Sequence, residues 1–151
     1  MKKSLLGIAA FVLGISFSNI SKAQLADGSV APNFTSTDIT GASWDLYTVL
    51  NQGKTVIIDI SATWCGPCWN YHSSGALDQV MQQHGPTGMT GVNSSTTNDM
   101  MVFFVEGDAS TNTACLYGPT GCNSSTQGDW VTGTLSPILD DASIANSYQI
   151  T

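Results

Sequence analysis

The sequence contains no arginine and only four lysines among its 151 residues, against eleven acidic residues, so its formal net charge is -7. Proteins that bind nucleic acids neutralise phosphates with clustered cationic side chains. The composition therefore excludes a nucleic-acid-binding protein, and the same shortage of cations excludes binding to an anionic membrane surface.

Long apolar runs are also scarce, and the longest one lies near the N-terminus. Residues 5–17 are almost entirely apolar, follow two lysines, and lead to the small-x-small sequence Ser21-Lys22-Ala23. This arrangement predicts a secretory signal peptide over residues 1–23. The run is short for a membrane span, so an uncleaved anchor is the alternative, and the lack of a cysteine at the cleavage site argues against a lipoprotein.

We expect residues 24–151 to form one domain in the periplasm or outside the cell, with no stable membrane anchor after signal cleavage. This length suffices for one hydrophobic core and hardly for two. Only Lys54 then remains beside the eleven acidic residues, which gives a formal charge of -10.

The apolar pattern predicts an α/β domain. The stretches 34–38 and 43–46, separated by a turn, predict an N-terminal β-hairpin. The runs 55–60 and 100–105 are rich in β-branched and aromatic residues and predict two parallel strands covered on both faces. Residues 66–84 predict the helix that connects them, with a weak point at Gly75 in its middle.

Two polar stretches and a second helical pattern complete the chain. Residues 87–99 predict a solvated loop. Residues 107–133 are long for a loop in a compact domain, unless they have a function or a cross-link. Residues 137–148 predict another helix.

The centre of the sequence is the motif Cys65-Gly66-Pro67-Cys68, preceded by Trp64 and the first predicted parallel strand. Backbone N–H groups and the dipole at a helix start lower the pKa of a thiol, so Cys65 is the predicted nucleophile. Cys68 lies about one turn later and is the predicted resolving thiol. Gly66 allows close approach of a substrate backbone, Pro67 fixes the first turn, and Trp64 shields the sulfur.

Asp59 is the third predicted catalytic residue. A carboxylate is costly to bury in a strand of valine and isoleucine, and six residues before Cys65 it could point beneath the motif toward Cys68. We interpret it as a general base that acts through a water on Cys68. The alternative is an aspartate that hydrogen-bonds locally or faces solvent.

Two other uses of a Cys-x-x-Cys motif fit less well. A zinc site needs further ligands, and the nearby candidates are His72 and His84, without a second Cys-x-x-C. Haem attachment is excluded because Trp69 follows Cys68. We therefore expect no metal and no cofactor, and we interpret His72 as a half-exposed helix residue outside the site.

Cys115 and Cys122 form the second pair of cysteines and enclose a turn-rich hexapeptide. In an oxidising compartment such a pair predicts a structural disulfide, which contributes about 2.5 kcal/mol in the chain-entropy model. A second redox pair is the alternative.

The sequence resembles the thioredoxin superfamily, and more closely the TlpA-like extracytoplasmic redoxins of the AhpC/TSA-related branch. The matching residues are Ala31-Pro32-Asn33-Phe34, Asp38, Gly41, Leu46, Gly53-Lys54 and Trp64-Cys65-Gly66-Pro67-Cys68. The resemblance implies a thioredoxin-like fold, a central sheet flanked by helices with an N-terminal β-hairpin extension. It also implies a thiol-disulfide oxidoreductase that acts on protein thiols or disulfides and is served by a reductant or oxidant partner.

One departure concerns the end of the sequence. The family carries a cis-proline opposite its active cysteines, in a segment that residues 148–151 resemble only at their start. We therefore expect a C-terminally truncated chain, with the last strands and helix of the fold missing.

Two competing functions remain at this stage. A thiol peroxidase would need proline and threonine where Ile58 and Ala62 stand, and an arginine that the sequence lacks. A secreted binding or structural module with an idle redoxin fold is the other alternative, supported by the long polar loops.

Overall fold

The computed structural model describes residues 25–150, so the predicted signal peptide lies outside the described residues. Within this range, no helix combines the length and the apolar character that a membrane span requires. The proline-containing segment that the resemblance implies also does not fall within the described residues.

The predicted N-terminal hairpin is present. Strands β1 (Thr35–Thr37) and β2 (Ser43–Asp45) pair antiparallel, with Thr35 opposite Asp45. The carboxylate of Asp38 organises the turn, since it accepts hydrogen bonds from the backbone N–H groups of Thr40 and Ala42 and from the indole of Trp44. Helix α1 (Leu46–Asn51) follows directly, capped by Asp45. This capping carboxylate accepts hydrogen bonds that lower its pKa to about 2.

The central sheet is parallel and has the strand order β3 (Thr55–Ser61), β4 (Met100–Glu106), β5 (Ile138–Asp140). The prediction of one helix over 137–148 is therefore wrong in its first part, and the parallel core has three strands where the sequence indicated two. Apolar Ile138 and Leu139 pack beside the buried strand β4, and the backbone N–H of Phe104 donates to the carbonyl of Pro137. Helix α4 is confined to Ala142–Ser147.

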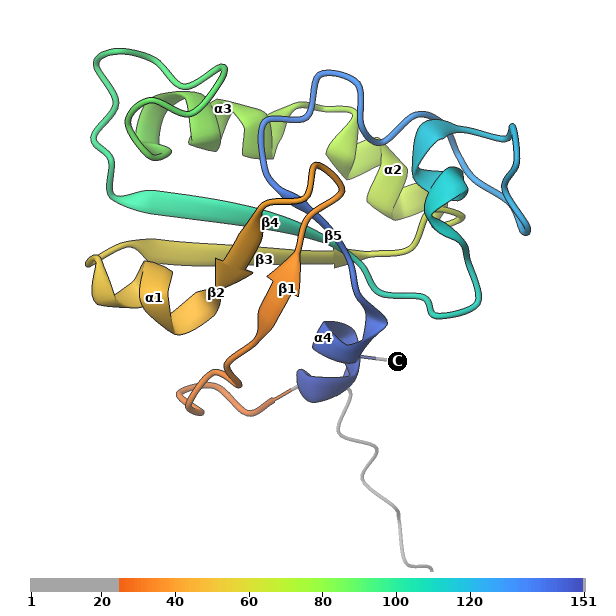
Figure 1. Ribbon diagram of the computed structural model, residues 1–151, viewed down its shortest axis with the longest axis horizontal. Coiled ribbons are helices and arrows are strands. Elements are labelled where there is room, and N and C mark those ends of the chain that lie inside the picture. The colour runs from red at the N-terminus through yellow and green to blue at the C-terminus, as the bar shows by residue number, and fades with distance from the viewer. Residues whose placement is uncertain (1–24, 151) are drawn as a thin grey trace, which may run out of the picture.

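The predicted helix 66–84 is divided into α2 (Gly66–His72) and α3 (Ala76–His84). Gly75 adopts φ +70°, a left-handed conformation that ends regular helix geometry. Figure 1 shows α2 and α3 on one side of the sheet, and α1 and α4 on the other.

A small apolar cluster attaches the long polar loop 107–136 to helix α2. Its fully or almost fully buried members are Phe104, Leu116, Trp130 and Ile138, and Cys68 and Trp69 pack against them. The loop includes the short 3-10 helix η1 (Thr113–Tyr117), and the N–H of Trp130 donates to the carbonyl of Leu116. Burial of a large aromatic side chain contributes several kcal/mol, so Trp130 holds this loop against the motif-bearing helix.

Candidate active site

The motif lies where β3 ends and α2 begins, as the sequence predicted. Cys65 is the N-cap residue of α2, and its sulfur accepts a hydrogen bond of 3.3 Å from the backbone N–H of Cys68. Pro67 lies in the first turn. Cys65 and Cys68 are joined by a disulfide, with their Cα atoms 5.3 Å apart. The N–H donor to Cys65 is one of the groups that would stabilise its thiolate after reduction.

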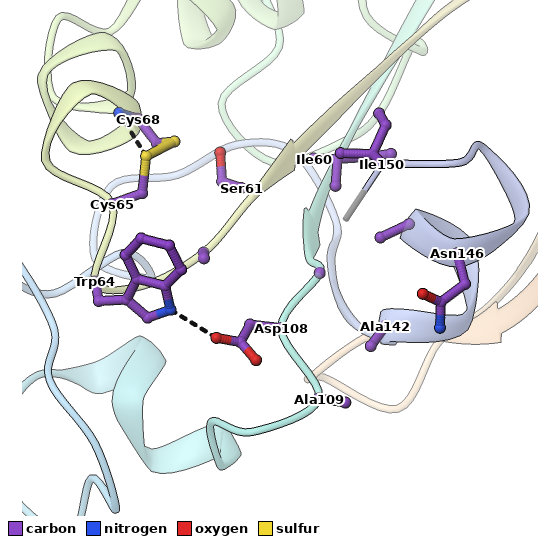
Figure 2. A pocket seen from close by; sticks show the side chains of 13 residues that line it. Ile60, Ser61, Trp64, Cys65, Cys68, Asp108, Ala109, Ala142, Asn146 and Ile150 are labelled. Carbon is purple, nitrogen blue, oxygen red and sulfur yellow. Dashed lines mark hydrogen bonds between the residues drawn. A yellow bond between two sulfur atoms is a disulfide. The ribbon is translucent and has the colours of Figure 1, made fainter. Parts of the chain in front are cut away.

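Trp64, which directly precedes the motif, is held in place by a residue that was not among the predicted site residues. Its indole N–H donates to the carboxylate of Asp108 at 2.6 Å (Figure 2). The tryptophan stays 48% exposed. The Trp64 indole and the hydroxyl and N–H of Ser110 hold the pKa of Asp108 below its usual range. The sequence did contain a signal for this contact, because Asp108 comes just after the second predicted parallel strand and Trp64 just after the first. The C-terminal ends of parallel strands lie at the same edge of a sheet, so residues that follow them can meet.

The polar loop also contacts the backbone of the motif. The Gln127 N–H donates to the carbonyl of Thr63, and its side-chain amide donates to the carbonyl of Trp64 at 2.9 Å. Nearby, a Cβ atom on Gly128 would come within 2.6 Å of the Trp69 ring, so only glycine allows this close approach. The loop thus fixes the segment that delivers Cys65.

A cavity of about 450 Å³ opens beside the disulfide (Figure 2). It lies between the end of β3, the turn after β4, and helix α4. Its lining includes Ile60, Cys65, Cys68, Asp108, Asn146 and Ile150. Both cysteines of the motif therefore border this cavity.

Asp59 is half-buried in β3, and the hydroxyl of Ser61 donates to its carboxylate at 3.3 Å. Burial raises the pKa of Asp59, and the Ser61 hydrogen bond and the nearby His72 offset part of this increase. Among the described residues, no direct hydrogen bond joins Asp59 to either cysteine of the motif. In the disulfide form Cys68 carries no thiol proton, so the base role that the sequence suggests for Asp59 concerns the reduced form.

His72 lies one turn after Cys68 within the aromatic packing of α2. Its ring centroid is 5.7 Å from that of Trp69, 5.5 Å from Phe104 and 4.9 Å from Trp130. Burial lowers the pKa of His72, while the carboxylates of Asp78, Asp59 and Asp129 act in the opposite direction.

Glu106 is a second carboxyl group near the motif that the sequence analysis missed. It is only 1% exposed at the end of β4, and its Oε1 accepts hydrogen bonds of 3.1 Å from the Asp108 N–H and the Thr111 hydroxyl. Its Oε2 accepts no hydrogen bond from a residue of the described range 25–150. Burial raises the pKa of Glu106. The glutamate thus orients the turn that carries Asp108.

Cys115 and Cys122 also form a disulfide, with a Cα separation of 4.4 Å. Cys115 is fully buried and Cys122 half-buried, and neither lines the cavity.

Within residues 25–150, no three histidine, cysteine, aspartate or glutamate side chains gather as metal ligands. His84, one of the two zinc candidates, instead contacts Thr97 and Asp99.

No protein-family model matches the sequence, and no curated protein matches it. Among solved structures, a candidate protein disulfide isomerase from Bacteroides thetaiotaomicron superposes with a TM-score of 0.55 at 21% identity, covering 82% of this chain and 64% of that one. The thioredoxin domain of a thiol-disulfide oxidoreductase from Bacteroides vulgatus superposes with a TM-score of 0.51 at 19% identity, covering 84% of this chain and 76% of that one.

The chain thus spans 64% of the length of the first of these two proteins. The superpositions show a shared thioredoxin-like fold, with a central parallel sheet flanked by helices. The fold class predicted from the sequence is confirmed.

Proposed function

We propose, from the thioredoxin-like fold that these structures share with this chain, that the protein is a thiol-disulfide oxidoreductase. The observation that carries the proposal is the Cys65–Cys68 disulfide, which caps helix α2 and lines the cavity. Its substrates are disulfides or thiols of exported proteins, and a separate reductant or oxidant restores its starting state. The signal-like N-terminus and the second disulfide support a location in the periplasm or outside the cell.

In the reducing direction, the Cys65 thiolate attacks one sulfur of a substrate disulfide and releases the other sulfur as a thiolate. This gives a mixed disulfide between Cys65 and the substrate. Cys68 then loses its proton and attacks the Cys65 sulfur, which releases the second substrate thiolate and forms the Cys65–Cys68 disulfide. Two electrons pass from the protein to the substrate, and the reverse sequence oxidises a substrate dithiol.

Asp59 is the proposed acceptor of the Cys68 proton, through a water. The raised pKa of Asp59 supports this role, because a base works best when its pKa is close to the working pH. Trp64 supplies a flat apolar contact for the substrate beside the cavity, and Gly66 and Pro67 shape the turn between the two thiols.

Reduction of insulin by dithiothreitol tests the proposal. We expect the chain to accelerate the reaction, and Cys65→Ser to reduce it to the uncatalysed rate. The double variant Cys115→Ser/Cys122→Ser is the matched control and should keep most of the activity. If the unaltered chain performs no better than Cys65→Ser, the oxidoreductase function is wrong and the binding-module alternative gains support.

A second experiment identifies the substrates. In Cys68→Ser the mixed disulfide cannot be resolved, so substrate proteins should remain covalently attached to Cys65. Mass spectrometry of the trapped complexes would name them.

A further inference from the structure

Cys68 and His72 share one aromatic environment. The aromatic cluster of Trp69, His72, Phe104 and Trp130 lies between helix α2, strand β4 and the polar loop, with ring centroids 4.9 to 5.7 Å apart for the pairs that involve His72. Cys68 packs against the same group of buried residues. The second cysteine of the motif and an imidazole thus occupy one poorly solvated region.

Asp59 lies on strand β3, next to the aromatic cluster. In the parallel pairing of β3 and β4, Asp59 is the register partner of Phe104, and such partners point to the same face of a sheet. Phe104 contacts His72, so this face is the one that α2 covers. The carboxyl group therefore lies on the sheet face to which the imidazole is packed. Each group also acts electrostatically on the pKa of the other.

Few other side chains can supply positive charge here. The described residues contain one lysine and two histidines as possible cations. Lys54 binds Asn98 at the other end of β3, and His84 contacts Asp99 at the end of α3. Within residues 25–150, His72 is therefore the group that can place a positive charge near Asp59.

The other titratable groups that face His72 are acidic. Asp78 belongs to α3 and Asp129 to the polar loop, and both favour the protonated imidazole, as Asp59 does. The hydroxyl of Thr134 lies 3.3 Å from Nε2 of His72, and burial among the aromatic rings opposes the charge. Burial is the largest of these influences, so the pKa of His72 lies below its usual value, and the three carboxylates offset part of this decrease.

We propose that His72 is a positioning residue which, acting through Asp59, sets the pH range in which Cys68 resolves the mixed disulfide. The proposal rests on the oxidoreductase function above. A protonated His72 stabilises the Asp59 carboxylate, the form that accepts the Cys68 proton. Without His72, Asp59 keeps its proton to higher pH, and resolution requires a higher pH.

The kinetic test uses the reduced protein and dithiodipyridine, a small disulfide that releases a coloured thiopyridone at each of the two steps. Attack by Cys65 releases the first product, and attack by Cys68 on the mixed disulfide releases the second. For His72→Phe, which keeps a ring in the cluster, we expect the second step to slow about threefold or more on the acidic side of its profile. The first step should be unchanged.

His84→Gln is the matched control, because it removes the other histidine without touching the cluster, and its profile should equal that of the unaltered chain. A His72→Phe profile that superimposes on that of the unaltered chain in the second step would overturn the proposal. Absence of the second release in the unaltered chain would instead overturn the oxidoreductase function itself, which separates the two failures.

A second measurement needs neither turnover nor the His72→Phe variant. The sequence has only two histidines, so in His84→Gln the remaining imidazole signal in NMR belongs to His72. Adding Asp59→Asn should lower the pKa of His72, because the carboxylate that stabilises its charge is lost. Adding Asp45→Asn, at the distant cap of α1, should not. An unchanged His72 titration in the Asp59→Asn background contradicts the proposal, whatever the chain's activity.

Discussion

The two disulfides of this chain differ in the spacing of their cysteines, three positions for Cys65–Cys68 and seven for Cys115–Cys122, and in their surroundings. Cys65–Cys68 lies at the start of helix α2 and lines a cavity, and strand β3 before it carries the half-buried Asp59. Cys115–Cys122 ties the 3-10 helix η1 to a polar turn, and Cys115 is fully buried away from the cavity. Helix-start N–H groups favour a thiolate, whereas burial in apolar surroundings disfavours one. Under the proposed function, the first pair exchanges disulfides and the second pair is structural.

The two regions are nevertheless coupled through Trp130. The loop that the second disulfide constrains also carries Gln127, which binds the carbonyl groups of Thr63 and Trp64. Trp130 anchors that loop to α2 from the other side. A change in the second region should therefore alter the stability of the segment before Cys65, without taking part in electron transfer.

Trp130→Ala should have the largest effect on this coupling. The side chain is fully buried, and loss of a buried tryptophan costs about 4 kcal/mol of unfolding free energy. Urea denaturation measures the loss. Tyr117→Ala is the matched control, because Tyr117 is 53% exposed on the same loop and should change stability little. Equal destabilisation by the two variants would contradict the anchoring role.

Asp59→Asn tests the motif side of the comparison. Loss of a general base typically slows the step it serves about 100-fold, so release of the second product should slow strongly while the first step is retained. The exposed Asp99→Asn serves as control. Resolution that is unchanged between about pH 6 and 9 would remove the assignment.

The same variant has a predicted stability signature. Burial raises the pKa of Asp59 in the folded chain, so folding loses free energy as pH rises from the usual carboxyl range through the raised pKa. Asparagine carries no charge, so the variant does not lose this folding free energy as pH rises. Asp59→Asn should therefore be more stable than the unaltered chain at neutral pH, and the difference should shrink in acid.

The double variant Cys115→Ser/Cys122→Ser addresses the other region. Loss of this short cross-link should cost about 2.5 kcal/mol, mainly through the entropy of the unfolded chain. The rate of insulin reduction per folded molecule should stay close to that of the unaltered chain. A loss of activity as large as that of Cys65→Ser would instead favour a second redox pair.

Glu106→Gln should have the smallest effect. Because burial raises the pKa of Glu106, its cost to folding grows as pH rises above the usual glutamate range toward the raised pKa. The neutral amide avoids this cost, so the variant should be more stable relative to the unaltered chain at neutral pH than in acid. Denaturation at pH 4.5 and 7.5 measures the difference, with Asp27→Asn, at an exposed position outside the sheet, as control.

The sequence predicted the strands and helices that are determined by local residue patterns. The β-branched run before Cys65 and the apolar run 100–105 are long enough to identify strands without knowledge of their neighbours. The three-residue strand β5 was missed because it is short and is followed by a helix, so the whole segment showed a helical pattern. Its extended conformation depends on pairing with β4. Gly75 was noted as a weak point, but only the positive φ shows that it divides the helix.

The site residues could likewise be predicted only where local sequence patterns identify them. Cys65 and Cys68 could be identified from their own spacing and from the strand before them. The hydrogen bond from Trp64 to Asp108 and the packing of Trp130 on Trp69 join residues more than 40 positions apart. Such contacts depend on which loop folds over which helix, and that information is not carried by local patterns.

The most direct test of the account is to determine which disulfide opens first. The protein is equilibrated in buffers of increasingly reducing dithiothreitol ratio, free thiols are alkylated, and the modified cysteines are identified by mass spectrometry. We predict that Cys65 and Cys68 become alkylated while Cys115–Cys122 remains closed. If Cys115–Cys122 opens first, or both open together, the assignment of one exchange pair and one structural pair is wrong.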